Sequence, residues 1–267
     1  MNSGPHYKIW QWPNILALDA SLIAIAWLWV FSHRQNAYPG MVAYTVLALS
    51  VWLTYVADRL FDAMPRRSEH LLSARHQFAK RHSRKLWTVW TVLLLVNTAL
   101  AITCLAPKQL HRGIILLLFC LAYTVCNQLL SKNFFPKELA VALIFAGGTQ
   151  VFLPELSPWQ PLAAFALICL INCLLLGWKE EAIDTLLRVR SLSGVLNPLW
   201  FYLQLAMAIL LSLADALGLA LLPCLAVFLF LKSRVDSIQT ETYRVLCDAA
   251  LVLGPAFYFC SYSIVFR

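Results

Sequence analysis

Long runs of apolar residues fill most of the chain, and proline, glycine or charged residues interrupt them at short intervals. A helix needs about 20 mainly apolar residues to cross a bilayer, and many of the runs approach that length. The pattern therefore predicts an all-α, polytopic membrane protein with about nine transmembrane helices. We expect the spans at 14–32, 40–60, 86–106, 113–130, 138–154, 160–178, 197–214, 217–231 and 246–265.

Composition agrees with this prediction and excludes two other classes of protein. Of the 267 residues, 61% are hydrophobic and 13% are charged, whereas a soluble domain has about 25% charged residues. The 10 Trp, 9 Tyr and 15 Phe are far too many for a disordered chain. Because the spans use most of the chain, we expect a single transmembrane domain over residues 1–267.

Basic residues are concentrated in alternate loops. The chain has 21 Lys and Arg and a net charge of +8, and only Arg34, Lys108, Arg112 and Arg267 fall on the side opposite the N-terminus. Since Lys and Arg collect in cytoplasmic loops, we expect a multi-pass protein of the cell inner membrane with a cytoplasmic N-terminus. We interpret the basic segment 63–85 as a cytoplasmic loop attracted to anionic lipid, in preference to a nucleic-acid site.

Pairs of acidic residues lie at the cytoplasmic ends of two predicted spans. Asp58 and Asp62 end the second span, and Glu180 and Asp184 repeat the same spacing at the sixth. Residues four apart share one helical face, about 6 Å apart along the axis. Two facing pairs would form a cup of four carboxylates, and Mg²⁺ binds carboxylates together with substrate phosphates. Alternatively, these acids are salt-bridged helix ends at the headgroup interface.

The segment from Thr54 to Asp62 resembles the first signature of the UbiA-type intramembrane prenyltransferases, N-x-x-x-D-x-x-x-D on the second helix. Gly177, Glu180 and Asp184 are in register with the second signature of that family, D-x-x-D-x-x-x-D on the sixth helix. The resemblance extends over nearly the whole chain. Two positions depart from it, because Thr54 stands in place of Asn and Gly177 in place of Asp. Tyr123 and Lys132 match the Tyr and Lys of the family more loosely.

The resemblance implies an enzyme, a prenyltransferase that moves a polyprenyl group from prenyl diphosphate to a small acceptor, aromatic or other, within the membrane. It implies that Mg²⁺ is the cofactor. The metal ligands and catalytic residues would be Asp58, Asp62, Glu180 and Asp184. The residues that bind diphosphate would be Arg59, Arg66, Lys132, Lys179 and Arg188. The candidates for the substrate pocket are Thr54, Tyr55, Tyr123 and Asp19.

Other functions remain open. The altered positions Thr54 and Gly177 favour a second hypothesis, in which the protein keeps this fold, has lost transfer activity and binds or transports an isoprenoid or a related lipid. An ion-coupled transporter would need charges at mid-membrane depth, where Asp19 is the candidate. Asp19 would either meet a polar acceptor in the cavity or accept a hydrogen bond from a neighbouring helix.

Overall fold

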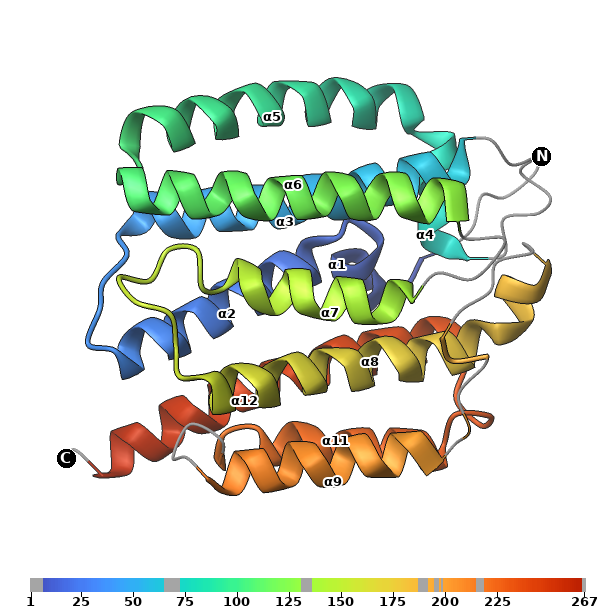
Figure 1. Ribbon diagram of the computed structural model, residues 1–267. Coiled ribbons are helices and arrows are strands. Elements are labelled where there is room, and N and C mark those ends of the chain that lie inside the picture. Colours follow the sequence, from blue (N-terminus) through green and yellow to red (C-terminus); the bar gives the residue numbers. More distant parts are fainter. Residues whose placement is uncertain are drawn as a thin grey trace.

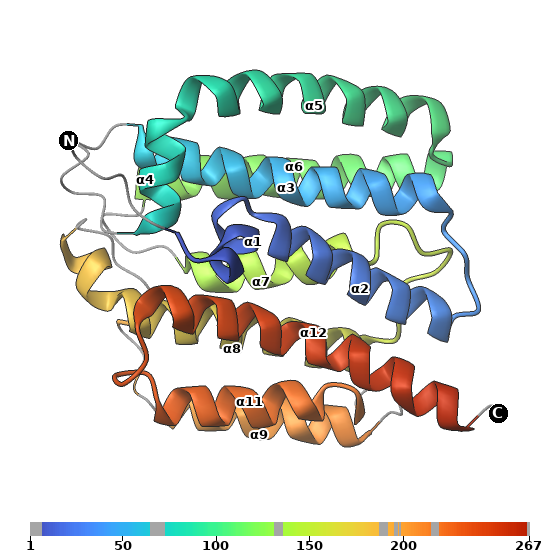
Figure 2. The ribbon, with the colours of Figure 1, turned by 180° about the vertical axis from the view of Figure 1, so that it is seen from behind.

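The computed structural model describes residues 7–64, 73–130, 136–186, 192–194, 197, 199–214 and 219–265. These residues are helical with short connections and contain no β-strand, so the all-α prediction is confirmed for them. The elements are η1 (Ile9–Gln11), α1 (Trp12–Ile15), α2 (Leu18–Arg34), α3 (Met41–Ala63), α4 (Ala74–Arg81), α5 (Ser83–Cys104), α6 (Pro107–Leu130), α7 (Lys137–Gly148), α8 (Trp159–Leu186), α9 (Leu199–Leu213), α11 (Leu222–Ser233) and α12 (Thr240–Val265). The long helices lie side by side along one direction (Figures 1 and 2).

Five of these helices, α3, α5, α6, α8 and α12, are long and apolar enough to cross a membrane. The bent pair formed by η1–α1 and α2 meets the same criterion as a sixth, while α9 and α11 are apolar but shorter. Each predicted span overlaps a helix, although fewer helices than the nine expected are long enough. The predicted span 138–154 is too long, because α7 ends at Gly148 and residues 149–158 connect it to α8. The long apolar helices indicate a membrane protein.

The first predicted span is broken. The helices on either side of the break differ in direction by 76°, and Ala17 between them has a left-handed φ of 58°. A break exposes backbone carbonyls that water cannot reach inside a bundle, and such groups need partners. Arg59 of α3 supplies them, because its Nη1 donates to the carbonyl oxygens of Asn14 at 2.7 Å and Ile15 at 2.9 Å. The break turns α1 and the start of α2 toward the interior.

A proline in α12 sets how α2 and α12 pack. Pro255 has no N–H and leaves the carbonyl of Leu251 without its helical donor. The indole Nε1 of Trp27 on α2 donates to that carbonyl at 2.9 Å. Gly254 makes room for the indole, since a Cβ there would lie 2.6 Å from the Trp27 ring. The contact therefore satisfies the backbone and brings the two helices close together.

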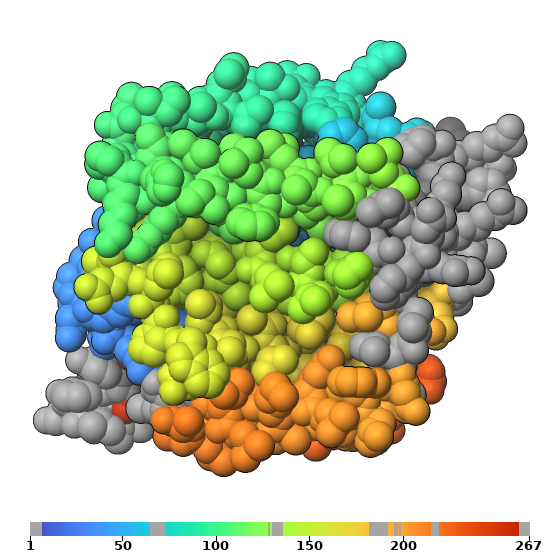
Figure 3. All heavy atoms as spheres, viewed as in Figure 1, coloured from blue at the N-terminus to red at the C-terminus, as the bar shows by residue number. Residues whose placement is uncertain are grey.

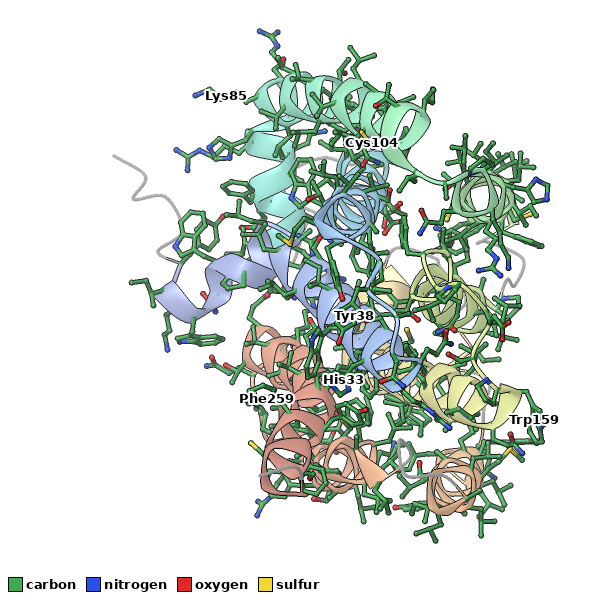
Figure 4. All side chains as sticks on the ribbon, turned by 90° about the vertical axis from the view of Figure 1, so that its left-hand side faces the viewer. His33, Tyr38, Lys85, Cys104, Trp159 and Phe259 are labelled. Carbon is green, nitrogen blue, oxygen red and sulfur yellow. The ribbon has the colours of Figure 1, made fainter. Side chains whose placement is uncertain are left out.

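The buried core lies between α2, α3, α7, α8, α9, α11 and α12, around side chains such as Trp27, Phe165 and Phe201. The helices α6, α7, α8 and α9 follow one another across one face of the molecule (Figure 3). Figure 4 looks along the bundle, with His33, Tyr38, Cys104 and Trp159 near the ends of different helices. The outer helices α5 and α6 expose many apolar side chains, as expected of a surface that faces lipid, for example Leu118 and Phe119.

The segment 63–85 differs from the solvated loop predicted from its charge. Residues 65–72 lie outside the described residues, but residues 74–81 form the helix α4, which packs against α3. Ala79 is buried there against Val56, Leu60 and Ala63 of α3. The prediction of a plain loop is therefore wrong for this part. Apolar residues at helical spacing fold it onto the bundle and bring Arg75 and His76 to the interior.

Candidate functional site: a polar cavity inside the bundle

A cavity of ≈ 380 Å³ lies between α1, α2, α3, α4, α6, α7, α8 and α12. Its volume is within the range of small-molecule sites, about 300–1,000 Å³. Asp58 and Asp62 of α3 and Glu180 of α8 all line it, so two acidic segments far apart in sequence meet at one cavity. Apolar side chains line the space between the polar groups, among them Leu47, Val51, Leu116, Phe145 and Leu176.

Most of the residues predicted for the site reach this cavity. Those that line it are Asp19, Thr54, Tyr55, Asp58, Arg59, Asp62, Tyr123 and Glu180. Thr54 donates its hydroxyl hydrogen back to the carbonyl of Ser50, at 2.9 Å. The residues Arg66, Lys132 and Arg188 lie outside the described residues, and so does the side chain of Asp184.

The pair Asp58 and Asp62 occupies one face of α3. The Asp62 side chain is 29% exposed, and Nε2 of His76 is 4.0 Å from its Oδ2. Burial, together with the charges of Arg75 and Arg244, lowers the pKa of His76 well below its usual value, so the imidazole is neutral near pH 7. A neutral ring at 4.0 Å forms neither an ion pair nor a hydrogen bond with Asp62.

Glu180 has a different environment. Its Oε1 accepts from Nε of Arg244, and its Oε2 accepts from Nη2 of Arg75 at 3.3 Å. The Arg244 side chain is 1% exposed and also pairs with Glu241 at 3.1 Å. Both oxygens of Glu180 therefore already interact with cations from α4 and α12.

The predicted cup of four carboxylates stays a prediction, because the side chain of Asp184 lies outside the described residues and Glu180 is paired with two arginines. Across the described ranges, no group of three or more His, Cys, Asp or Glu side chains is arranged to hold a metal ion. Asp58 and Asp62 are two carboxylates on one helical face that line the cavity. This donor set fits a single Mg²⁺ held by two carboxylates with water and substrate phosphates completing its coordination.

The basic residues of the site are mostly not those predicted. Lys179 is one residue before Glu180 and points away from the cavity. Its Nζ donates to the carbonyl of Val235 at 2.6 Å and lies 5.8 Å from the centre of the Tyr243 ring. The structure therefore does not place Lys179 at the cavity, and its role in binding diphosphate stays a prediction. Arg75 and Lys137 line the cavity instead, although no spacing in the sequence distinguishes them from other basic residues.

Arg59 lines the cavity as predicted, and its Nη1 is held by the carbonyls of the broken first helix. This structural role was not expected. The sequence gives no sign of it, because the break at Ala17 carries neither proline nor glycine.

The packing around Gly177 leaves little room for a side chain. A Cβ at this position would lie 2.9 Å from Cβ of Ser193 and 3.4 Å from Oε1 of Glu138. The carboxylate of Glu138 accepts from the backbone N–H of Leu192, at 3.1 Å and 3.2 Å to its two oxygens. The residues 192–194 thus occupy the space that an aspartate side chain would need.

A second polar group lies at the inner end of the cavity. Nδ2 of Asn14 donates to Oδ2 of Asp19 at 2.7 Å and to Oδ2 of Asp248 at 3.0 Å. Nδ2 of Asn172 is 3.4 Å from Oδ1 of Asp248. We refer to Asn14, Asp19, Asn172 and Asp248 as the inner cluster. Sequence reasoning missed Asp248, although a lone aspartate inside an apolar span was a usable signal.

Comparisons of the chain with protein-family models, with curated proteins and with solved structures found no match. The resemblance to the UbiA-type prenyltransferases therefore depends on the signature-like residues alone.

Proposed function

We propose that the protein is an intramembrane transferase that moves a polyprenyl group from its diphosphate to a small acceptor, with Mg²⁺ as cofactor. The observation that carries this proposal is the meeting of Asp58, Asp62 and Glu180, from two distant segments, at one cavity with apolar walls. A diphosphate needs a charged end and a polyprenyl chain needs an apolar one, and the cavity offers both.

The charged end would bind the diphosphate. Asp58 and Asp62 would hold Mg²⁺, which when bound neutralises the diphosphate as a leaving group. Arg75 and Lys137 line the same end and would share the negative charge that develops on departure. Glu180 has a positioning role in this arrangement, because it holds the Arg75 guanidinium at 3.3 Å.

The apolar walls would bind the polyprenyl chain. Burial of each methylene-sized unit contributes about 0.8 kcal/mol to binding. The same walls would exclude water from the allylic carbon, which becomes electron-poor as its bond to oxygen breaks.

We propose further that α2, α3, α5, α6, α7, α8, α9, α11 and α12 are nine membrane crossings. In this arrangement the charged end of the cavity faces the cytoplasm of a cell whose inner membrane holds the protein. The accumulation of Lys and Arg in the connections at that end supports this orientation. Lipid would surround α5 and α6, whose apolar side chains are exposed.

The test is turnover by the purified full chain in lipid nanodiscs, with Mg²⁺, labelled farnesyl diphosphate and a panel of phenols, aliphatic alcohols and aromatic acids. We expect release of pyrophosphate together with a labelled prenylated product. Asp62→Asn should lose this activity. Glu181→Gln is the matched control, because Glu181 is an exposed acid beside Glu180 that does not line the cavity. Release no faster than from empty nanodiscs would contradict catalysis.

A second candidate function is binding or transport of an isoprenoid diphosphate without transfer. The observation that favours it is the pairing of Glu180 with two arginines, which leaves fewer carboxylates for metal than the family signature provides. This candidate predicts Mg²⁺-dependent binding of farnesyl diphosphate with no pyrophosphate released.

A further inference from the structure

The inner cluster joins three parts of the bundle through one side chain. Asn14 of α1 donates from a single Nδ2 to both Asp19 of α2 and Asp248 of α12. Oδ1 of Asp19 also accepts from the backbone N–H of Ala20, at 2.9 Å. All four members of the cluster line the cavity. Their polar atoms are therefore placed at a space large enough for a ligand.

One buried atom of the cluster lacks a partner. Asn172 is 7% exposed, and its Nδ2 faces the carboxylate of Asp248. Its Oδ1 is buried and accepts no hydrogen bond from any described residue. A buried acceptor left unpaired costs free energy, so a ligand that donates a hydrogen bond to this oxygen would gain affinity.

The acidic side chains of the cluster restrict which chemical groups a ligand can place there. Two acidic side chains, Asp19 and Asp248, lie side by side, and Asn14 donates to both of them. Arg59 lines the same cavity, but its Nη1 is engaged by the carbonyls of Asn14 and Ile15. A ligand carboxylate would place a third carboxyl group beside this pair, which is unfavourable because adjacent carboxyl groups resist ionising together, whereas a hydroxyl or amine group would donate to their oxygens.

The cluster is also distinct from the charged end. Asn172 is eight residues before Glu180 on α8, which corresponds to about 12 Å along the helix axis. Asp248 is four residues after Arg244 on α12, or about 6 Å. A ligand at the inner cluster would therefore lie beside a diphosphate bound at the charged end and not in its place.

We propose that the inner cluster is a binding subsite for a small molecule that donates hydrogen bonds through hydroxyl or amine groups, and that it discriminates against carboxylates. Assigning this molecule as the acceptor of prenyl transfer depends on the function proposed above. The binding preference itself does not depend on that function.

The test compares three ligands with one ring system and different polar groups. These are 2,6-dihydroxynaphthalene, 2,6-dimethoxynaphthalene and 6-hydroxy-2-naphthoate, titrated against the full chain in nanodiscs by naphthalene fluorescence, with empty nanodiscs as the blank. We expect the dihydroxy compound to bind about tenfold more tightly than either of the others, because only it offers donors at both ends without a negative charge. Equal affinity for the dihydroxy and dimethoxy compounds would overturn the proposal.

Two variants test whether the inner cluster causes the preference for the dihydroxy compound. Asn172→Leu removes the unpaired oxygen and should bring the affinities for the dihydroxy and dimethoxy compounds together. Asp248→Asn removes one of the two adjacent carboxyl groups at constant size and should weaken the discrimination against the naphthoate. Asn97→Leu is the matched control, because Asn97 is also a buried asparagine with an unpaired Oδ1 but does not line the cavity. Its ligand preferences should equal those of the wild type.

The outcomes separate this proposal from the proposed function. A preference for the dihydroxy compound without any prenyl transfer supports the subsite and contradicts the transferase. Transfer to carboxylate and hydroxyl acceptors with equal efficiency contradicts the subsite and supports the transferase. An unchanged preference in folded Asn172→Leu and Asp248→Asn would overturn the proposal. Should both variants unfold, the comparison of ligands on the wild type still decides it.

Discussion

The acidic segments of α3 and α8 have the same spacing in sequence and different surroundings in the structure. Asp58 and Asp62 share a face of α3 and line the cavity, with the buried, neutral His76 as the neighbour of Asp62. Glu180 of α8 lines the same cavity but pairs with Arg75 and Arg244.

Spacing therefore predicts which acids face a common space, but it does not predict which of them can bind a metal. The charge of Glu180 is balanced by residues of α4 and α12, which reach α8 only through packing. In this account α3 holds the metal, and α8 holds the arginine that assists it.

The largest expected effect is on the α8 side. Arg244→Leu removes the nearer of the two arginine partners of Glu180 and should lower the free energy of unfolding by about 3 kcal/mol, since Arg75 alone compensates the charge of this largely buried group only in part. Denaturant titration of the detergent-solubilised protein measures this. Arg234→Leu, at an exposed arginine, is the control. The double variant Glu180→Gln/Arg244→Leu should recover part of the lost unfolding free energy. If Arg244→Leu alone loses less than about 1 kcal/mol, the pair contributes no more than an exposed ion pair, which would contradict this account.

The second effect concerns activity on the α3 side. Asp58→Asn should lower prenyl transfer by about 100-fold and leave the unfolding free energy nearly unchanged, because it removes a proposed metal ligand that forms no close ion pair with an arginine of the described residues. Glu180→Gln should keep the dependence on Mg²⁺, since it changes the positioning of Arg75 and not the metal. Initial rates over a range of Mg²⁺ concentrations distinguish the two variants. An equal loss of the Mg²⁺ dependence in both variants would contradict the assignment of Asp58 as a metal ligand and Glu180 as a positioning residue.

A substitution at Gly177 tests how closely Ser193 packs on α8. Gly177→Ala should destabilise the protein by about 1–3 kcal/mol, because its Cβ would crowd Ser193. The matched control is Gly113→Ala, where the nearest atom to an added Cβ is in ordinary contact at 3.8 Å, so that a gain of up to about 1 kcal/mol is expected from helix propensity. Thermal unfolding of both variants gives the difference. Equal melting temperatures would show that Ser193 does not pack closely on α8.

The smallest effect is expected at Lys179. Lys179→Gln loses the hydrogen bond to Val235 and should lower stability by about 1 kcal/mol. Its affinity for farnesyl diphosphate should change by less than about twofold, because the side chain points away from the cavity. Equilibrium binding in nanodiscs measures this, and a tenfold loss would return Lys179 to the diphosphate site.

Apolar patterning predicted the helices well, because runs near the thickness of a bilayer have few alternatives to a helix. It missed the break at Ala17, since the stabilising contacts come from Arg59 of another helix. It also missed the helix at 74–81, where a net basic charge obscured the apolar positions that pack on α3.

The site was predictable to the extent that its residues share one helix. Asp58 and Asp62 follow from their spacing, whereas Arg75 and Asp248 come from helices whose placement depends on the whole bundle. The pairing of Glu180 with Arg244 joins residues 64 positions apart, and no local pattern encodes it.

The central claim is that the α3 carboxylates bind a divalent cation for a diphosphate in this cavity. Its most direct test is the affinity of the full chain for farnesyl thiolodiphosphate, a non-hydrolysable analogue, with Mg²⁺ and with EDTA. We predict that Mg²⁺ tightens binding by about tenfold or more in the wild type and has no effect in Asp58→Asn/Asp62→Asn. Equal affinity in Mg²⁺ and EDTA for the wild type would contradict the claim.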